Sequence, residues 1–357
     1  MKELKKIGVA VIGLGAIGTR HTQLYHSSSN ADLIAISDTN NELSQKISED
    51  LDIELTFKNY EDLLKETNIH AISICVPNHL HADFSVKALE SGKHVLCEKP
   101  MATNFSDAQR MLDAAKANNR QLMIGFFERF RPSTQSVKKM IINGAFGEVY
   151  HAQIVYQRRR GIPGLGSWFT NKKKSGGGPL IDIGVHILDL ALYLMDYPSI
   201  KTVSAATHQK FGDKSDYNYI NMWAEKSSIS GGTFDVEDYA TTLIRLTNGS
   251  TISMECSWAA NLEQRQYACL LGEKRGVKLE NGDAIIYGED HGSIATIEIQ
   301  TKTQDPYQNE IDHFIECAKK NIAPIGSGSQ IIKLQRLIDA IYKSALIGHE
   351  INFEGTE

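Results

Sequence analysis

Polar residues in an otherwise apolar segment are the first candidates for chemistry. Asp182 and His186 lie four residues apart in 181–195, where most other positions are Ile, Leu, Val or Ala. This pattern predicts a helix, and the spacing places both side chains on one of its faces. An imidazole can exchange a proton near neutral pH, and a carboxylate can orient a hydroxyl group. On spacing alone, a buried structural histidine and a helix-capping aspartate are favoured instead, because polar i,i+4 pairs are common on helices.

A glycine-rich loop follows the first apolar run of the chain. Residues 7–12 (IGVAVI) predict a strand, GLGAIG follows at 13–18, and a helical pattern begins there. Glycines permit a tight turn and close approach of the backbone to a pyrophosphate, which the N–H groups of a helix N-terminus bind. The motif alone could be an ordinary turn, but its place between a strand and a helix favours dinucleotide binding. The loop residues expected at the cofactor are Gly13, Gly15, Ala16, Ile17 and Gly18.

An acidic residue ends the second apolar run. Asp38 lies 20 residues after Gly18, where a carboxylate is expected to accept hydrogen bonds from the adenosine ribose. It could instead only cap the helix that follows. The acid would repel a 2′-phosphate, and Thr39 and Asn40 provide no cation to offset that repulsion. The sequence therefore favours NAD over NADP as the cofactor.

The elements that must carry these residues follow two patterns. Over the first 125 residues, short apolar runs alternate with helical patterns, which predicts an α/β unit with a doubly wound parallel sheet (a Rossmann fold). The expected strands are 7–12, 33–37, 71–76, 94–97 and 121–125, and the expected helices are 19–27, 41–50, 60–66, 81–91 and 106–118.

After about residue 126 the pattern changes to strands joined by tight turns. The pairs at 248–249 and 281–282 are both Asn-Gly, a strong hairpin signal, so this half is expected to be α+β with a mostly antiparallel sheet. An amphipathic helix is expected at about 330–347. The expected strands are 149–157, 238–246, 250–258, 266–271, 276–280, 284–287 and 294–301.

Composition narrows the class of protein. The chain has 357 residues, 41% hydrophobic and 23% charged, which suits two globular domains. A net charge of −5 provides no broad positive field for nucleic acid or an anionic membrane, and we find no apolar run of about 18 residues. The five scattered cysteines predict buried thiols in a reducing cytoplasm. We expect no metal, because His79 and His81, near Asp83, lack a further ligand at a typical spacing.

Three further motifs make the whole pattern specific. They are VPNHLH at 76–81, EKP at 98–100 and GGGPLIDIGVHILD at 176–189. In this order, after the glycine loop, they resemble the glucose–fructose oxidoreductase and inositol dehydrogenase family (Gfo/Idh/MocA). The resemblance implies a Rossmann domain at 1–125, a substrate-binding and oligomerisation domain at 126–325, and a C-terminal helix and tail at 326–357 that return to the first domain. The second domain would be an open, mostly antiparallel sheet with helices on one face, through which such proteins form homodimers or homotetramers.

The resemblance also implies an activity and roles for residues. Members move a hydride between a nicotinamide and a secondary alcohol or ketone of a sugar, cyclitol or polyol. Carried over, His186 is the general base in oxidation, Asp182 orients a substrate hydroxyl, and Lys99 stabilises alkoxide character. By itself, Lys99 could be a solvated loop lysine. The further cofactor contacts implied are Pro77, Asn78, His81, Glu98 near the carboxamide, Lys99 and Trp168, and Pro100 is expected to follow a cis peptide bond.

Weaker candidates for substrate binding lie in loops. Arg159 belongs to an arginine run at 158–160 that leads toward the candidate helix, and such runs are usually solvated. Trp168 lies in the same loop, and Arg129 either binds substrate or pairs with a carboxylate between the domains. Specificity is expected in 157–175 and 208–236. Two other functions remain open: an NAD-retaining enzyme that oxidises a sugar transiently to allow elimination or glycoside cleavage, and a non-catalytic NAD(H)-binding regulator.

Overall fold

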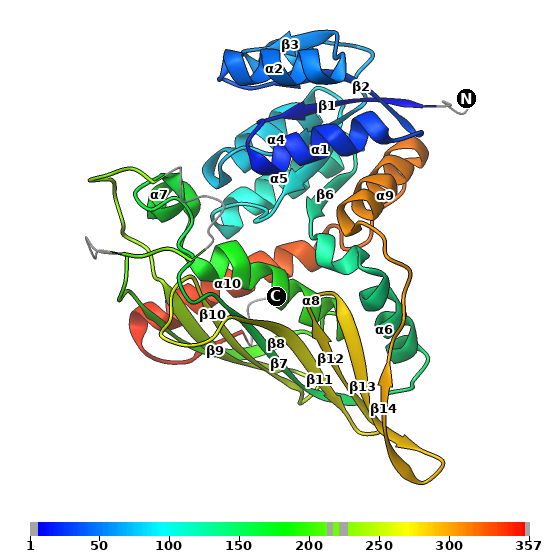
Figure 1. Cartoon of the computed structure of the whole chain (residues 1–357), viewed down its shortest axis with the longest axis vertical. Coiled ribbons are helices and arrows are strands. Elements are labelled where there is room, and N and C mark those ends of the chain that lie inside the picture. Colours follow the sequence, from blue (N-terminus) through cyan, green and yellow to red (C-terminus); the bar gives the residue numbers. More distant parts are fainter. Residues whose placement is uncertain (1–5, 213–216, 221–227, 354–357) are drawn as a thin grey trace. The chain divides into compact units, whose positions relative to one another are not determined.

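The computed structural model describes residues 6–212, 217–220 and 228–353. They form two compact units, one of Met1–Phe127 with Asp305–Gln335 and the other of Glu128–Gln304 with Arg336–Glu357. Each unit contains one sheet (Figure 1). Part of the expected specificity loop, residues 213–216 and 221–227, lies outside the described residues.

The first unit is built on a six-stranded sheet in the order β3-β2-β1-β4-β5-β6, and every neighbouring pair is parallel. Strands β1, β4, β5 and β6 are buried along their whole length, as expected for strands covered on both faces. The short edge strand β3 was not predicted, since three residues give no periodic signal. The strands are β1 (Ile7–Ile12), β2 (Ala31–Ser37), β3 (Leu55–Phe57), β4 (Ala71–Ile74), β5 (His94–Glu98) and β6 (Leu122–Gly125).

The predicted helices of the first unit are present. Asparagine side chains cap three of them, at Asn40, Asn59 and Asn104, each accepting a hydrogen bond from a backbone N–H of the first turn. The helices are α1 (Ala16–Ser27), α2 (Asn41–Leu51), α3 (Tyr60–Leu63), the 3₁₀ turn η1 (Asn78–Leu80), α4 (His81–Glu90), α5 (Phe105–Ala117) and α9 (Pro306–Lys320).

The second unit is built on a nine-stranded sheet in the order β14-β13-β12-β11-β7-β10-β9-β8-β15. Its pairs are antiparallel except β7 with β10, so the predicted α+β half is confirmed. Strand β8 lay outside the predicted set. The strands are β7 (Val149–Gln157), β8 (Ile200–His208), β9 (Tyr239–Leu246), β10 (Thr251–Ser257), β11 (Arg265–Gly272), β12 (Arg275–Glu280), β13 (Asp283–Asp290), β14 (Ser293–Glu298) and β15 (Ile351–Asn352).

Within the described residues, one face of this sheet is covered and the other carries partly exposed side chains such as Leu243 and Leu271. Side chains such as Ile244, Ile252 and Leu270 are buried, and helix α8 (Val185–Leu194) contacts strands β7 and β11. The other helical segments that follow the first unit are η2 (Phe127–Phe130), α6 (Pro132–Ile142), η3 (Trp168–Thr170), α7 (Lys172–Ser175), the π-helical turn η4 (Leu180–Gly184) and α10 (Ser329–Ile347).

The compact units divide the chain differently from the expected limits at 125 and 325. Helix α9, expected in the second domain, belongs to the first unit, where it contacts α1. The predicted helix at 330–347 is present as α10, but it passes from the first unit into the second after Gln335. Residues 336–353 group with the second unit, where β15 adds a strand to the sheet beside β8. The tail was expected to return to the first domain instead.

One helical stretch is long and apolar enough to cross a membrane by composition. It is Lys172–Leu194, and 89% of its most apolar window is buried inside the structure. Burial of that kind is what the core helix of a folded protein shows, and the left-handed Gly176 interrupts the stretch after α7.

Candidate active site

The glycine loop has the geometry that a pyrophosphate requires. Gly13 has a φ of +88°, and a Cβ on it would lie 2.5 Å from the carbonyl oxygen of Cys75. A Cβ on Gly18 would lie 1.8 Å from the carbonyl oxygen of Gly13, so both positions demand glycine. Gly15 differs, because nothing lies within 4 Å of the position of its Cβ, and it caps α1 without a side-chain hydrogen bond. The N-terminus of a 12-residue helix is therefore open where a phosphate would bind.

Asp38 is held rigidly beside this loop. One carboxylate oxygen accepts the backbone N–H of Leu14 at 2.7 Å, and the other accepts that of Asn40 at 2.8 Å. The side chain is half-buried at the end of β2, so lone pairs remain for ribose hydroxyls. The fixed negative charge opposes a 2′-phosphate at the same point. The loop and Asp38 thus fit NAD, which would be held by Gly13–Gly18 and Asp38.

His81 connects two of the sequence motifs. Its Nε2 lies 2.8 Å from the carbonyl oxygen of Val76, and its Nδ1 lies 2.6 Å from that of Pro100. The ring is buried, and desolvation lowers the pKa of His81 while the two carbonyl contacts oppose that shift. His81 was expected to touch the cofactor, but both ring nitrogens are engaged by the backbone of the two loops. Its place is that of a support between VPNHLH and EKP.

The remaining motif residues of the first unit follow β4 and β5. Asn78 is buried and Pro77 half-buried in the loop after β4, and Lys99 is half-buried after β5. The Lys99–Pro100 peptide bond is cis, as the family resemblance implied. Because the carboxyl ends of parallel strands meet at one edge of the sheet, these residues and the glycine loop share the edge at which α/β folds bind ligands.

The candidate helix of the second unit exposes only its two expected polar residues. Between Gly177 and Leu194, every residue is buried except Asp182 and His186, which are half-buried. The predicted helix at 181–195 begins with the π-helical turn η4 and continues as α8. Single π-helical turns are frequent at functional sites. Lys99 belongs to the first unit, and Asp182 and His186 belong to the second.

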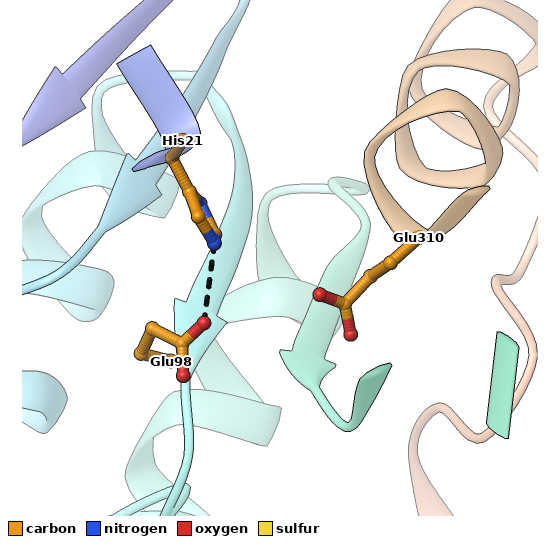
Figure 2. Close-up of side chains that lie close together, drawn as sticks. All are labelled: His21, Glu98 and Glu310. Carbon is orange, nitrogen blue, oxygen red and sulfur yellow. Dashed lines mark ion pairs between the residues drawn. The ribbon is translucent and has the colours of Figure 1, made fainter. Parts of the chain in front are cut away.

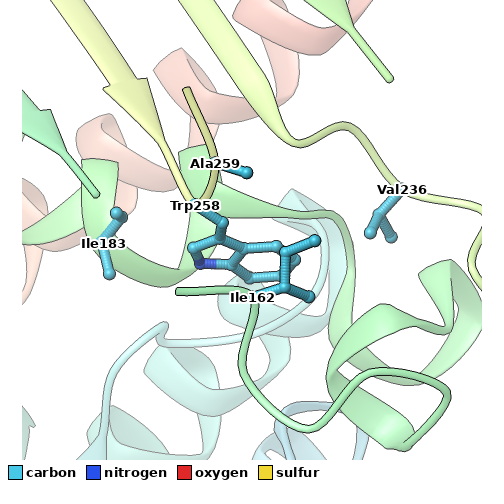
Figure 3. Packing of buried hydrophobic residues seen from close by; sticks show 5 residues of the cluster. All are labelled: Ile162, Ile183, Val236, Trp258 and Ala259. Atoms are coloured by element: carbon cyan, nitrogen blue, oxygen red, sulfur yellow. The ribbon is translucent and has the colours of Figure 1, made fainter. Parts of the chain in front are cut away.

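Trp258 holds the carboxylate of Asp182 and was missed from the sequence. Its indole N–H donates to Asp182 Oδ2 at 2.9 Å, and the ring is fully buried. Figure 3 shows it packed among Ile162, Ile183, Val236 and Ala259. Trp258 lies 76 residues from Asp182 at the end of β10, and no local spacing relates the two. Sequence reasoning assigned it only to the end of a strand.

Two glycines before η4 make room for close packing contacts. A Cβ on Gly177 would lie 2.0 Å from the hydroxyl of Tyr342, and one on Gly178 would lie 2.0 Å from the carbonyl oxygen of Glu237. The Glu237 carboxylate accepts the N–H of Leu180 at 3.2 Å and the Tyr342 hydroxyl at 2.9 Å. Burial raises the pKa of Glu237. The absence of a Cβ at Gly177 and Gly178 thus lets Tyr342 and Glu237 pack against the start of the helix.

Arg129 has a structural position. Its Nε donates to Asp189 at 2.6 Å and its guanidinium also donates to the Tyr197 hydroxyl at 2.6 Å, with all three side chains buried. The guanidinium is 1% exposed, so it is not available to a substrate in this conformation. The expected partner carboxylate is present, but it belongs to the same unit as Arg129. Asp189 thus ties α8 to η2.

The loop candidates differ in what they touch. Arg158 donates to the carbonyl oxygen of Gly161, and Arg160 donates to that of Ala260 at 2.9 Å. Arg159, between them, is exposed. Trp168 is half-buried and stacks on Phe169 at a centroid distance of 3.8 Å. Of the arginine run, Arg159 is therefore the most exposed.

Comparison with known proteins agrees with this geometry. Residues 7–126 match the family described as "Oxidoreductase family, NAD-binding Rossmann fold", and residues 134–278 match "GFO/IDH/MocA C-terminal domain". D-glucoside 3-dehydrogenase of Escherichia coli (strain K12) is 31% identical over 96% of this chain and 96% of that protein. scyllo-Inositol 2-dehydrogenase (NAD(+)) of Bacillus subtilis (strain 168) is 26% identical over 90% of this chain and 88% of that protein.

A solved structure extends the similarity to three dimensions. Levoglucosan dehydrogenase in complex with NADH and levoglucosan has a TM-score of 0.86 and 22% sequence identity, covering 98% of this chain and 100% of that one. At that identity the likeness shows the fold alone. The sequence matches span both units, and the Escherichia coli relative aligns over nearly its whole length. With its NAD-binding Rossmann domain and its second, sheet-based domain, the chain belongs to the Gfo/Idh/MocA family of oxidoreductases.

Proposed function

We propose that the protein is an NAD-dependent dehydrogenase of a secondary alcohol in a sugar or cyclitol, with Lys99, Asp182 and His186 around the reacting carbon. The observation that carries this is that, between Gly177 and Leu194, Asp182 and His186 alone are partly accessible while every other residue is buried. Polar side chains on such a helix cost free energy unless they are hydrogen-bonded, as Asp182 is to Trp258, so their presence calls for a reason such as a functional role. Dehydrogenases of a glucoside and of an inositol among the relatives support the substrate class.

The proposed residues divide the work of alcohol oxidation. NAD, when bound, accepts the hydride from the substrate carbon. His186 takes the proton of the substrate hydroxyl and returns it in the reverse direction. The ammonium group of Lys99 stabilises negative charge that develops on the same oxygen. Asp182, fixed by the Trp258 N–H, accepts a hydrogen bond from a neighbouring hydroxyl and so orients the ring.

A substrate panel tests the activity directly. Absorbance of NADH is followed with glucosides, free aldoses, anhydrosugars and inositols, each with NAD and with NADP. We expect turnover of at least one of them, with NAD favoured because Asp38 opposes a 2′-phosphate. NADH formed in step with oxidised product supports a dehydrogenase. Product formed without net NADH would indicate the NAD-retaining alternative, and tight NADH binding without any turnover would indicate a regulator.

We also infer a homo-oligomer that forms through the uncovered face of the second sheet. The strand register places Leu243, Leu271 and Tyr287 on that face, and their exposed fractions are 36%, 39% and 46%. Apolar side chains gathered on one face favour association. Light scattering after gel filtration should give a dimer or tetramer, and Leu271→Arg should reduce its mass. A monomeric parent protein would contradict the inference.

A cytoplasmic location is supported by the cysteines. All five are free, and Cys269 alone of them is not fully buried. Thiols of this kind persist where the compartment is reducing.

A further inference from the structure

Three buried ionisable side chains meet in the first unit, and no role in binding or catalysis has been assigned to them as a group. His21 comes from α1, Glu98 from the end of β5 and Glu310 from α9, and they are 0%, 7% and 0% exposed. Ring-nitrogen and carboxylate-oxygen atoms of the three lie within 4.8 Å of one another. Figure 2 shows the imidazole and the Glu98 carboxylate facing each other, with the Glu310 carboxylate directed from its helix toward them. We call these residues the buried triad.

The electrostatics of the buried triad require a positive charge or a shared proton. Two buried carboxylates at this separation repel one another strongly in a medium of low dielectric constant. The His21 Nε2 lies 3.2 Å from Glu98 Oε1, an ion-pair distance, so the imidazole is the basic group that faces this carboxylate. Its other nitrogen lies 3.1 Å from Ser73 Oγ, which lies 2.8 Å from the Tyr25 hydroxyl. These contacts fix the ring so that Nε2 faces the carboxylate.

The buried triad is connected to Lys99 through Glu98. While Oε1 faces His21, Glu98 Oε2 accepts the backbone N–H of Lys99 at 3.2 Å. Gly125, the β6 partner of Glu98, makes room for this carboxylate, because a Cβ there would lie 2.9 Å from Oε1. The Glu98 carboxylate thus connects His21 to the backbone of Lys99.

We propose that His21 and Glu310 are positioning residues that act through Glu98 to hold Lys99 in its catalytic position. The proposal rests on the proposed catalytic role of Lys99. Sequence reasoning expected Glu98 near the nicotinamide carboxamide, whereas its two oxygens are directed to His21 and to the backbone of Lys99. Because Glu310 lies on α9, which follows the second unit in the chain, the triad is complete only once the chain has returned to the first unit.

A divalent cation is the competing occupant of the triad. One histidine and two carboxylates are suitable ligands. The direct contact of His21 with Glu98 is favoured, because Glu98 Oε2 accepts the Lys99 N–H and leaves only one oxygen of this carboxylate for an ion. A metal would be measured as stoichiometric zinc, manganese or iron in the purified protein.

The test is steady-state kinetics on the best substrate of the panel. His21→Leu removes the 3.2 Å contact with the Glu98 carboxylate, and His21→Gln keeps a donor on a side chain of similar reach. We expect kcat to fall about tenfold in His21→Leu, the KM values to change less than about twofold, and His21→Gln to recover most of the loss. Glu310→Gln keeps the shape of its side chain and should lower kcat by a smaller factor. It serves as the second variant should His21→Leu fail to fold.

The matched control is at the other end of the same strand. Lys93 is buried just before β5, where its ammonium donates to the carbonyl oxygens of Glu66 and Ile69 at 2.6 and 2.8 Å. Lys93→Met should lower the midpoint of thermal unfolding and leave kcat unchanged. If Lys93→Met lowers kcat as much as His21→Leu, the effect is one of general stability and the proposal is overturned.

A double-mutant cycle separates this proposal from the proposed function. If Lys99→Met leaves kcat unchanged, the catalytic role of Lys99 fails. If Lys99→Met lowers kcat and His21→Leu lowers it further by the same factor in that background, His21 does not act through Lys99 and the positioning role fails. We expect the tenfold effect of His21→Leu to disappear in the Lys99→Met background. Stoichiometric metal that is lost in His21→Leu would also overturn the proposal in favour of a metal site.

Discussion

The two units hold their candidate residues by different means. In the first unit the cofactor loop is made of backbone, and its requirements are local: a left-handed Gly13, a close approach at Gly18 and an open Gly15. In the second unit Asp182 and His186 lie on a helix whose start is gripped by residues from distant strands and from α10. A binding loop can therefore be predicted from a local sequence motif. The position of a candidate catalytic side chain depends instead on long-range contacts that the neighbouring sequence does not reveal.

The largest effect should come from His186 in the second unit. His186→Ala removes the proposed proton acceptor, so kcat for the best substrate should fall by about 10²–10⁴-fold. The affinity for NADH, measured by fluorescence titration, should stay within about twofold, because the loop that binds it lies in the other unit.

A half-buried histidine of the same unit serves as the control. His151 lies on β7, and its Nδ1 is 2.8 Å from the hydroxyl of Thr251 on the neighbouring strand β10. His151→Ala should retain nearly full kcat. If His186→Ala also retains nearly full kcat, the assignment of His186 as the base is wrong, and the second unit does not supply the proton acceptor through this helix.

The next effect concerns a residue that sequence reasoning missed. Trp258→Phe removes the N–H that donates to Asp182 and keeps most of the apolar ring. We expect kcat/KM to fall about tenfold or more, because one hydrogen bond to a charged group contributes about 1.5–3 kcal/mol.

The packing control for Trp258 is in the same cluster. Ile162→Val removes one methylene group from that cluster and should cost about 1 kcal/mol of unfolding free energy without changing kcat/KM. Equal changes in kcat/KM for the two variants would mean that packing, and not the hydrogen bond, supports Asp182.

In the first unit, two glycines should respond in opposite ways. Gly15→Ala adds a methyl group to open space at a φ of −59°, so the fold should be unchanged while the Kd for NAD rises about tenfold or less. Gly18→Ala places a Cβ 1.8 Å from a carbonyl oxygen and should destabilise the unit by about 1–3 kcal/mol. Calorimetric titration with NAD and thermal unfolding measure the two. A Gly15→Ala protein that binds NAD normally would contradict the placement of the pyrophosphate.

Much of the fold was accessible from the sequence because its signals are periodic. Each long strand of both sheets except β8 was predicted, and the Asn-Gly turns located two hairpins. The short β3 and β15 gave no period, and the passage of α10 between the units depends on tertiary contacts. Asp182 and His186 were found through a motif, but Trp258, Glu237 and the buried triad could not be. Their partners lie between 57 and 289 residues away in the sequence, so local spacing cannot reveal these contacts.

The smallest effects are on stability, and they should have opposite pH dependence in the two units. Burial lowers the pKa of His94 from 6.5 to about 4, so the folded first unit resists protonation there. The contribution of neutral His94 is present above pH 6.5 and is lost as the pH falls toward 4. As the pH falls through this window, the thermal-unfolding midpoint of the parent protein should therefore drop by a few degrees more than that of His94→Gln.

Glu237 in the second unit should show the reverse. Burial raises its pKa above the ordinary 4.5, so the folded state favours the protonated acid, and stability is lost as the pH rises above that value. As the pH rises, the thermal-unfolding midpoint of Glu237→Gln should therefore increase relative to that of the parent protein. If the midpoint differences of both variants change in the same direction with pH, they report a global change in charge. The two buried groups would then not set the pH dependence of stability in their own units. Opposite drifts would show that each unit carries its own titrating group, independent of whether a substrate is ever bound.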